Sequence, residues 1–177
     1  KLLKENFVLL GIAGKDFSAY EKWLKKNKID ASRVIRENRD FTSEANVVTD
    51  SKDQQLTIFY PGAAAWSKKY TRRIHIIIHR LSKELAFAHI APNDRHFMLA
   101  CIDACRKNRV PYFFDPGQAM SLFSTGELRH IIKNAFGLFL NEYELGLLEK
   151  TLKLPSQKIA KLCGIMVVTL GEKGSDM

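Results

Sequence analysis

The sequence predicts an α/β fold with a mainly parallel sheet flanked by helices. From Leu85 onward, short apolar runs rich in β-branched and aromatic residues alternate with longer segments of helical periodicity. The apolar runs end at proline, glycine, asparagine or aspartate, which are typical of loops. Strands that alternate with helices predict βαβ units with right-handed crossovers.

The first 30 residues predict one strand and one helix. The apolar run at residues 7–10 leads into a glycine-containing loop, which is the pattern of a strand end. Ser18 and Glu21 have the spacing of a capping box, which predicts that a helix begins there. The apolar face of that helix is predicted to consist of Phe17, Tyr20 and Leu24.

Residues 40–62 predict a small β excursion outside the βαβ pattern. Asn46–Thr49 and Leu56–Tyr60 are rich in residues that favour strands, and Asp50–Asp53 between them are typical of a turn. We expect a hairpin that projects from the main domain with its apolar face poorly covered. A helix is predicted to follow at residues 66–83.

The remaining elements follow one another regularly. The predicted strands are residues 85–90, 110–114, 138–140 and 165–170. The first helix between them should turn Phe97, Cys101, Ala104 and Cys105 inward. Ser124 and Glu127 form a capping box for the next helix, which carries Leu128, Ile131, Ile132 and Ala135. A helix to about Leu152 and a short helix through Ile159 and Cys163 complete the pattern.

Polar or glycine-rich residues follow four consecutive predicted strands, and ligands bind beyond the carboxyl ends of such strands. The groups are Pro92 and Asn93, then Asp115 and Gln118, then Asn141 and Glu144, then Thr169, Gly171 and Gly174. This row suits Mg²⁺ with a polyphosphate, because glycines let backbone N–H groups approach phosphate oxygens. Each group alone also fits a turn, a helix cap or a bend. Four in succession favour a site.

The composition narrows the class of partner. A net charge of +9 admits a nucleic-acid partner, but no helix-turn-helix, zinc finger or aromatic-basic RNA motif occurs, so we expect no nucleic acid. No apolar run approaches the ~20 residues that span a bilayer, so we expect no membrane association. Three cysteines favour reduced thiols in a cytoplasmic protein. Lys1 is not an initiator methionine, so we expect the chain to begin inside a longer gene product or to be processed.

Several motifs together resemble the ribokinase-like (PfkB) family of carbohydrate and nucleoside kinases. Residues 141–144 resemble its N-x-x-E motif, and residues 168–175 resemble its T-x-G-x-x-G nucleotide loop. Residues 112–118 resemble the family's strand-to-loop segment after the mid-sheet strand. The early G-x-x-G-x-D … G-I-D pattern is similar to residues 11–16 and 28–30, with Lys28 where glycine is usual. Phe41-Thr42 and Pro61-Gly62-Ala63 resemble the lid strand and the turn beside the acceptor site.

The resemblance covers essentially residues 1–177 and implies a partial ribokinase-like domain: a Rossmann-like sheet with a lid hairpin at about residues 40–62. It implies transfer of the γ-phosphoryl group of ATP, with Mg²⁺, to a hydroxyl of a sugar or nucleoside. The Phe41-Thr42 and Asp115–Gln118 segments are most similar to the adenosine kinase-like branch. In the family such lids can also pair subunits, which implies a homodimer through the lid.

The resemblance also implies roles for individual residues. The nucleotide-binding residues would be Asn141, Thr169, Gly171 and Gly174, and the metal-organising residue would be Glu144. The acceptor-binding residues would be Phe41, Thr42, Gly62, Ala63, Asp115 and Gln118.

The chain departs from the family in two motifs. The G-A-G-D motif with its general-base aspartate and the early di-glycine segment are absent from these 177 residues. We therefore assign no catalytic residue and expect the chain alone to be inactive. The alternative is a pseudo-kinase or nucleotide-binding regulatory fragment, and sequence beyond Met177 would distinguish the two.

Overall fold

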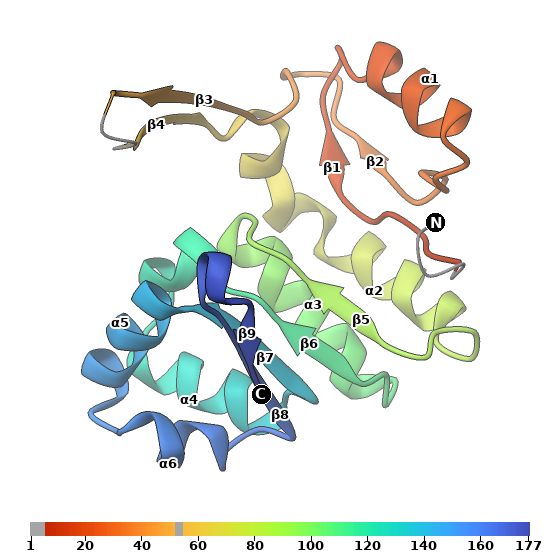
Figure 1. Cartoon of the computed structure of the whole chain (residues 1–177). Coiled ribbons are helices and arrows are strands. Elements are labelled where there is room, and N and C mark those ends of the chain that lie inside the picture. The colour runs from red at the N-terminus through yellow and green to blue at the C-terminus, as the bar shows by residue number, and fades with distance from the viewer. Residues whose placement is uncertain (1–5, 52–54) are drawn as a thin grey trace. The chain divides into compact units, whose positions relative to one another are not determined.

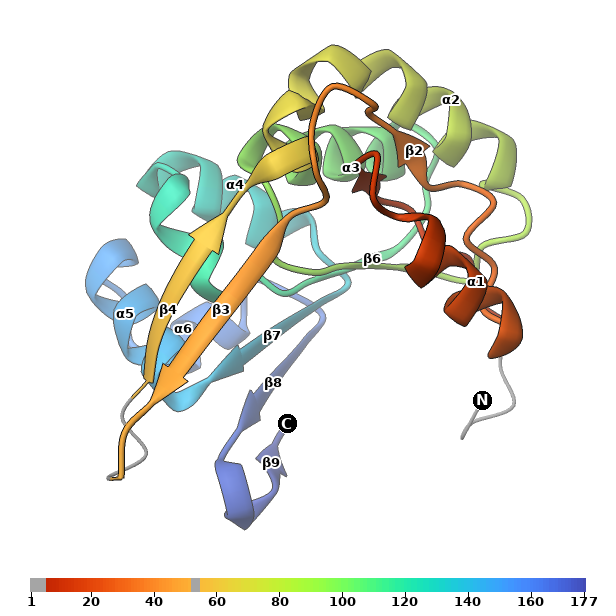
Figure 2. The ribbon, with the colours of Figure 1, turned by 90° about the horizontal axis from the view of Figure 1, so that it is seen from above.

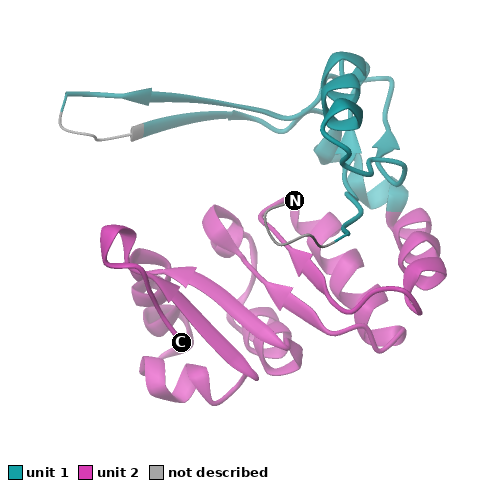
Figure 3. Ribbon diagram, turned by 45° about the vertical axis from the view of Figure 1, so that its right-hand side comes forward, with its two compact units in different colours: residues 1–70 teal, residues 71–177 magenta. Residues whose placement is uncertain are grey.

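The computed structural model describes residues 6–51 and 55–177. The chain divides into two compact units, Lys1–Tyr70 and Thr71–Met177 (Figure 3).

The first unit packs a short parallel strand pair against one helix. β1 pairs in parallel with β2, and Ile35 of β2 is fully buried. Ala13, Phe17 and Leu24 form a buried cluster, and the partly buried residues that pack against it are Leu9, Ile29, Ala31 and Val34. The elements of this unit are β1 (Ile12–Ala13), α1 (Ser18–Lys26), β2 (Ile35–Arg36), β3 (Glu44–Thr49), β4 (Gln55–Tyr60) and the 3-10 helix η1 (Gly62–Tyr70).

The start of the first unit corrects three predictions. The expected strand at residues 7–10 is reduced to a single parallel bridge between Val8 and Asp30. The capping box is wrong: the backbone of Phe17 is already helical, so Phe17 takes the N-cap position without a side-chain cap and Ser18 lies inside the helix. The third is the inward position of Tyr20: it is 54% exposed and stacks on the exposed Trp23, with 5.6 Å between ring centroids, so it does not belong to the buried face of α1.

The predicted hairpin is confirmed. β3 and β4 pair antiparallel, with Glu44 opposite Tyr60 and Thr49 opposite Gln55. The predicted turn lies partly outside the described residues. Both faces of the ribbon carry exposed apolar side chains, namely Val47, Val48, Leu56, Ile58, Phe59 and Tyr60. The helix predicted at residues 66–83 is present as η1 followed by α2 (Thr71–Leu81).

The second unit contains the predicted parallel sheet. The strand order is β5-β6-β7-β8-β9, and the first four strands are parallel. Strand β9 runs antiparallel to β8 and was not predicted, because it is only two residues long. After α2, the elements are β5 (Ala88–Ile90), α3 (Arg95–Lys107), β6 (Tyr112–Phe114), η2 (Gly117–Leu122), α4 (Thr125–Asn134), β7 (Gly137–Asn141), α5 (Glu142–Leu152), α6 (Ser156–Ala160), β8 (Ile165–Thr169), η3 (Gly171–Lys173) and β9 (Ser175–Asp176) (Figure 1).

The helices of the second unit cover one face of its sheet. Figure 2 shows β6, β7 and β8 nearly edge-on, with α3, α4 and α6 on the same side. On that side Tyr112 is buried and donates a hydrogen bond of 2.8 Å to the carbonyl oxygen of Ile131 in α4. The side chains that alternate toward the helices form a buried layer of Ile90, Tyr112, Phe114, Leu138, Leu140 and Val168.

The capping box predicted for α4 is confirmed. Ser124 accepts a hydrogen bond from the backbone of Glu127, and the Glu127 carboxylate accepts one from the Ser124 backbone. These hydrogen bonds from Ser124 hold the pKa of Glu127 below its ordinary value. The capped helix turns its predicted apolar residues Leu128, Ile131 and Ile132 into the core. The position of α4 is thus determined by local sequence and by burial together.

Three helices end in a left-handed residue that is basic rather than glycine. Lys28, Arg109 and Lys153 have φ values of 55°, 55° and 54°. At the end of α1, the backbone N–H of Ile29 donates to the carbonyl oxygen of Leu24, as in a Schellman motif. The resemblance singled out Lys28 as a replacement for glycine, and the structure shows that this position has the conformation that favours glycine.

Candidate nucleotide and acceptor site

The ends of two neighbouring strands bring Asn141 and Thr169 together. In the register of β7 and β8 these residues are direct partners, and the side chains of both are exposed. The Thr169 hydroxyl donates to the carbonyl oxygen of Leu140 at 3.4 Å, which fixes it against the end of β7. Asn141 and Thr169 therefore share the edge of the sheet at the carboxyl ends of the parallel strands, as the sequence predicts. We call this edge the rim.

Asn141 and Glu144 form a capping box at the start of α5. The backbone N–H of Glu144 donates to Asn141 Oδ1 at 2.8 Å, and that of Asn141 donates to Glu144 Oε2 at 2.9 Å. Asn141 is therefore a helix cap, which is one of the interpretations that the sequence left open. It does not exclude a second role, because the Asn141 amide nitrogen and Glu144 Oε1 take no part in these two bonds. The amino end of a helix also attracts phosphate.

The loop after β8 is shaped by glycines. Gly171 and Gly174 have φ values of +60° and +88°, which L-residues rarely adopt. A Cβ atom built at either glycine meets no atom within 4 Å, so the loop borders open space. The loop closes on itself through a 2.8 Å hydrogen bond from Leu170 N to Gly174 O. Its backbone is therefore preformed and approachable, as a phosphate-binding loop requires.

Asp115 and Gln118 lie on the same rim, after β6. The backbone of Asp115 donates to Ile90 O at 3.0 Å, which holds it beside the end of β5. The His89 Nε2 atom lies 3.6 Å from Asp115 Oδ2, and Gln118 is exposed. Sequence reasoning missed His89, because a single histidine in a short strand carries no spacing signal.

Within the first unit, Thr42 connects the predicted acceptor segment at residues 41–42 to the loop that carries Gly14 and Asp16. Its hydroxyl donates to Asp16 Oδ1 at 2.7 Å and accepts from Gly14 N at 3.0 Å. Its backbone N–H also donates to Asp16 Oδ1, at 2.8 Å. These bonds from Thr42 hold the pKa of the exposed Asp16 carboxyl below its ordinary value. An ionised carboxylate thus accompanies the predicted acceptor residues.

Phe41, Gly62 and Ala63 also come together. Ala63 N donates to Phe41 O at 2.7 Å, and Gly62 has φ +46° with no room for a Cβ, which would lie 2.4 Å from Phe41 O. Gly62 and Ala63 are buried, whereas the Phe41 ring is 51% exposed and lies beneath the Lys15 ammonium at 3.9 Å. Of these three, Phe41 offers the surface that a ligand can touch.

Asp40 ties the root of the hairpin to η1 and was missed from the sequence. It accepts hydrogen bonds from the Tyr60 hydroxyl and from Trp66 Nε1, the latter at 3.3 Å. Hydrogen bonding by Tyr60 is the main reason that the pKa of Asp40 lies below its ordinary value. Nothing in the sequence distinguishes Asp40 from an ordinary turn aspartate, because its partners lie 20 and 26 residues away.

Glu37 is the buried carboxylate of the first unit. It is 2% exposed and accepts two hydrogen bonds from the Arg39 guanidinium and one of 2.9 Å from the Tyr70 hydroxyl. The bonds from Arg39 hold its pKa far below its ordinary value. The Arg39 guanidinium in turn stacks over Trp66 at 3.8 Å. Glu37 therefore organises the base of η1.

The residues present can accommodate Mg²⁺ only through water and phosphate. Among residues 6–51 and 55–177, no three His, Cys, Asp or Glu side chains gather in a way that would hold a metal ion directly. Mg²⁺ commonly keeps several waters and uses one or two carboxylates together with substrate phosphates. Glu144 on the rim fits that second arrangement.

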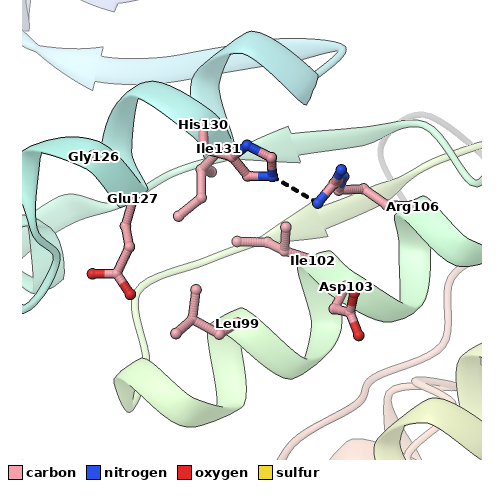
Figure 4. A pocket seen from close by; sticks show the side chains of 8 residues that line it. All are labelled: Leu99, Ile102, Asp103, Arg106, Gly126, Glu127, His130 and Ile131. Atoms are coloured by element: carbon pink, nitrogen blue, oxygen red, sulfur yellow. Dashed lines mark hydrogen bonds between the residues drawn. The ribbon is translucent and has the colours of Figure 1, made fainter.

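A pocket of about 320 Å³ lies between α3 and α4 (Figure 4). Its lining is apolar at Leu99, Ile102 and Ile131, and Arg106 and His130 form a 2.7 Å hydrogen bond at its edge. None of the residues predicted for the site lines it.

The entire chain matches one known protein family. Residues 1–177 match the pfkB family of carbohydrate kinases, so the chain belongs to that family. A nucleoside kinase of Methanocaldococcus jannaschii is 30% identical over 177 residues, covering 99% of this chain and 56% of that protein. A nucleoside kinase of Methanothermobacter thermautotrophicus is 29% identical over 170 residues, covering 94% of this chain and 53% of that protein.

Solved structures agree with this assignment. The Burkholderia thailandensis nucleoside kinase in complex with inosine superimposes with a TM-score of 0.86 at 25% identity, covering 98% of this chain and 55% of that one. The M. jannaschii nucleoside kinase, described as an archaeal member of the ribokinase family, gives 0.79 at 30% identity, covering 98% and 56%. The predicted ribokinase-like fold is thereby confirmed. The chain spans a little over half the length of these relatives.

No helix in the described parts of the chain has the length and apolar character needed to cross a membrane.

Proposed function

We propose that this chain is part of an ATP-dependent kinase that transfers the γ-phosphoryl group to a hydroxyl of a nucleoside. The observation that carries the proposal is the pairing of Asn141 with Thr169 at one rim, between the amino end of α5 and the Gly171–Gly174 loop. Family membership supports phosphoryl transfer. The nucleoside kinase relatives, one of them solved with inosine, support a nucleoside acceptor over a sugar.

In this proposal the rim binds the nucleotide. Asn141 and Thr169 contact phosphate oxygens through their amide and hydroxyl groups, and backbone N–H groups of the loop at Gly171 and Gly174 surround the phosphates. The positive end of the α5 dipole adds a favourable field. A second Burkholderia thailandensis structure, described as an ADP-inosine complex, supports an adenine nucleotide as the ligand.

Mg²⁺ would be organised by Glu144 through bound water. When bound, the ion would neutralise negative charge on the phosphate groups that are separated during phosphoryl transfer. The capping box holds the Glu144 side chain over the amino end of α5, so the carboxylate needs no rearrangement to meet a hydrated ion. Asn141 shares this arrangement and would position the same phosphates.

In the first unit, the residues proposed for the acceptor lie at the root of the hairpin. Phe41 offers an exposed ring for stacking on a base, and Thr42 positions the ionised Asp16 for hydroxyl groups. Gly62 and Ala63 would shape the turn beside the acceptor. In the second unit, Asp115 and Gln118 stay proposed as acceptor-binding residues. The hairpin would act as a lid that excludes water during transfer.

The exposed apolar ribbon also supports a homodimer. Two-stranded hairpins with apolar side chains on both faces are unstable alone in water, and β3 and β4 have such faces. We place the protein in the cytoplasm, since Cys101, Cys105 and Cys163 are all free thiols.

The direct test is ADP release by protein translated from the full reading frame around these codons. It should phosphorylate a nucleoside in the presence of ATP and Mg²⁺, with sugars as the comparison panel. We expect the 177-residue chain to show no turnover, because the family's general-base motif is not among its residues, and to bind ATP weakly. Robust turnover by the short chain, or ATP-dependent turnover with sugars alone, would contradict the proposal.

A catalytically inactive nucleotide-binding protein is the second candidate. ATP binding without turnover by the full-length protein would establish this alternative.

A further inference from the structure

His89 lies beside Asp115 in the second unit. The His89 Nε2 atom is 3.6 Å from Asp115 Oδ2, and the two side chains are 43% and 31% exposed, so a ligand can reach both. Asp115 is one of the residues proposed for the acceptor, whereas His89 has no role in that proposal. The contact therefore joins a candidate site residue to a histidine that the candidate site does not yet include.

The strand register places the two residues on the same face of the sheet. His89 of β5 is the direct partner of Phe113 of β6, and Asp115 follows Phe113 by two residues. The parallel ladder continues to Asp115, because its backbone N–H donates to Ile90 O at 3.0 Å. Side chains two residues apart along a strand point to the same side. The proximity of His89 to Asp115 thus follows from the backbone.

A contact between rings restrains the imidazole. The His89 ring meets the Phe139 ring edge to face, with 5.5 Å between the centroids and 65° between the planes. The Phe139 ring is itself packed against Phe113 at 5.4 Å. Aromatic contacts of this geometry are favourable and directional. They favour the orientation in which the Nε2 atom of His89 faces Asp115.

The Asp115 carboxylate has no other partner in residues 6–51 and 55–177: no lysine or arginine there pairs with it, and no group there donates a hydrogen bond to it. Within the first unit, by contrast, the Asp16 carboxylate accepts hydrogen bonds of 2.7 and 2.8 Å from Thr42. A carboxylate without a donor rotates easily about its last side-chain bond. His89 is therefore the group that can fix the orientation of Asp115.

The distance from Nε2 to Oδ2 is longer than a hydrogen bond, which joins such atoms at about 2.7–3.2 Å. Hydrogen bonds of a reaction site are often long in the unliganded protein and shorten when the substrate is bound. A small rotation of the Asp115 carboxylate toward His89 closes the gap.

We propose that His89 is a positioning residue for the acceptor: its Nε2–H group donates to one oxygen of Asp115 and so turns the other oxygen toward a hydroxyl group of the nucleoside. This inference rests on the proposed function, because it takes Asp115 as a residue that contacts the acceptor. Such a contact is the same before and during transfer, so the loss of His89 weakens nucleoside binding and leaves the rate of transfer unchanged.

The test compares His89→Leu with His89→Gln in the protein translated from the full reading frame. Leucine removes the donor at similar size, whereas the amide N–H of glutamine can replace that of Nε2. His75→Leu is the matched control, because His75 Nε2 lies 3.5 Å from Asp103 Oδ2 and neither residue belongs to the candidate site. The kcat and KM values are measured with inosine, with adenosine and with ATP.

We expect His89→Leu to raise the nucleoside KM about 10-fold, which corresponds to the loss of one hydrogen bond to a charged group. The kcat, the KM for ATP and the thermal midpoint should not change, and His89→Gln should retain most of the nucleoside affinity. In an Asp115→Asn background, His89→Leu should have no further effect. An unchanged nucleoside KM in His89→Leu would overturn the proposal, as would an equal rise in the KM for ATP, an equal rise in His75→Leu, or an additive effect in the Asp115→Asn background.

The contact itself is measured without turnover, which distinguishes a failure of this inference from a failure of the proposed function. In NMR spectra of histidine-labelled protein at constant pH, the ring signals of His89 should shift in Asp115→Asn, whereas those of His75 should not. Unmoved His89 signals would overturn the inference even in an active nucleoside kinase. A shift of the His89 signals in a protein that phosphorylates no nucleoside would contradict the proposed function, and with it the role of His89 in acceptor binding.

Discussion

Gly117, which follows β6, packs closely against Pro92, which follows β5. A Cβ atom at Gly117 would lie 2.4 Å from Cγ of Pro92, and the φ of Gly117 is +46°. The rim that carries Asp115 and Gln118 therefore depends on a glycine for two separate reasons, backbone conformation and space.

Gly117→Ala should destabilise the chain by about 1–3 kcal/mol, since it adds both strain and a clash. Gly146→Ala is the matched control: Gly146 lies within α5 with no atom within 4 Å of a Cβ, so alanine should stabilise by about 1 kcal/mol. Urea unfolding of both variants measures these changes. Equal effects of the two substitutions on stability would disprove the close packing of Gly117 against Pro92.

Replacing the left-handed basic residues by glycine should stabilise the fold. Lys28→Gly, Arg109→Gly and Lys153→Gly each relieve a conformation that costs an L-residue about 1–2 kcal/mol, offset in part by the greater unfolded-state entropy of glycine. We expect a net gain of about 0.5–1 kcal/mol for each. Lys26→Gly, inside the last turn of α1, should instead destabilise by about 1 kcal/mol. Thermal unfolding provides the comparison, and a loss of stability in all four variants would count against this account.

The first unit should lose stability as the pH falls below about 4. Hydrogen bonds lower the folded-state pKa of Glu37 and Asp40 from ordinary values of 4.5 and 3.8. A depressed carboxyl pKa contributes stability that is present above the unfolded-state pKa and lost as pH falls through the folded-state pKa. Asp40→Asn should make the acid dependence shallower.

Trp66 reports on this unit, because its indole nitrogen donates to Asp40. Trp23 is the second tryptophan and is 52% exposed, so a Trp23→Phe background isolates the Trp66 signal. The urea midpoint from Trp66 emission is compared between pH 7 and pH 3 with and without Asp40→Asn. An identical pH slope in both proteins would remove Asp40 from the explanation.

Two substitutions of Asn141 should distinguish its role in helix capping from a role in nucleotide binding. Asn141→Ala loses the cap and about 1 kcal/mol of stability, whereas Asn141→Asp keeps the cap. In the full-length protein, Asn141→Asp should nevertheless weaken ATP binding, because it adds negative charge beside the phosphates. Calorimetric titration with ATP and thermal unfolding are measured on the same samples. Unchanged ATP affinity in Asn141→Asp would leave Asn141 with the structural role alone.

Local patterns predicted most of the second unit. Apolar residues at every second position predicted its parallel strands, and apolar residues at helical spacing predicted its helices. The capping box of Ser124 and Glu127 predicted the start of α4. The succession of parallel strands predicted that their carboxyl ends lie at one edge of the sheet, and therefore that Asn141 and Thr169 lie together. The start of the first unit was harder, because its parallel strands β1 and β2 are two residues long and its loops are held by contacts across the chain, such as Thr42 with Asp16. Asp40 and His89 gave no signal for the same reason.

The contact between the Phe113 and Phe139 rings could not be foreseen either. Both resemble ordinary residues of a buried strand, and only the register shows that they share one side of the sheet.

The central claim is that the rim at Asn141, Glu144 and Thr169 serves phosphoryl transfer, and the rate of Glu144→Gln in the full-length protein tests it most directly. Glutamine preserves the capping box, so thermal stability should match the wild type. The rate of phosphoryl transfer to the preferred nucleoside should fall by about 10–100-fold, the usual cost of losing a residue that organises a metal ion through its surroundings. A Glu144→Gln protein that is equally stable and equally fast would contradict the claim.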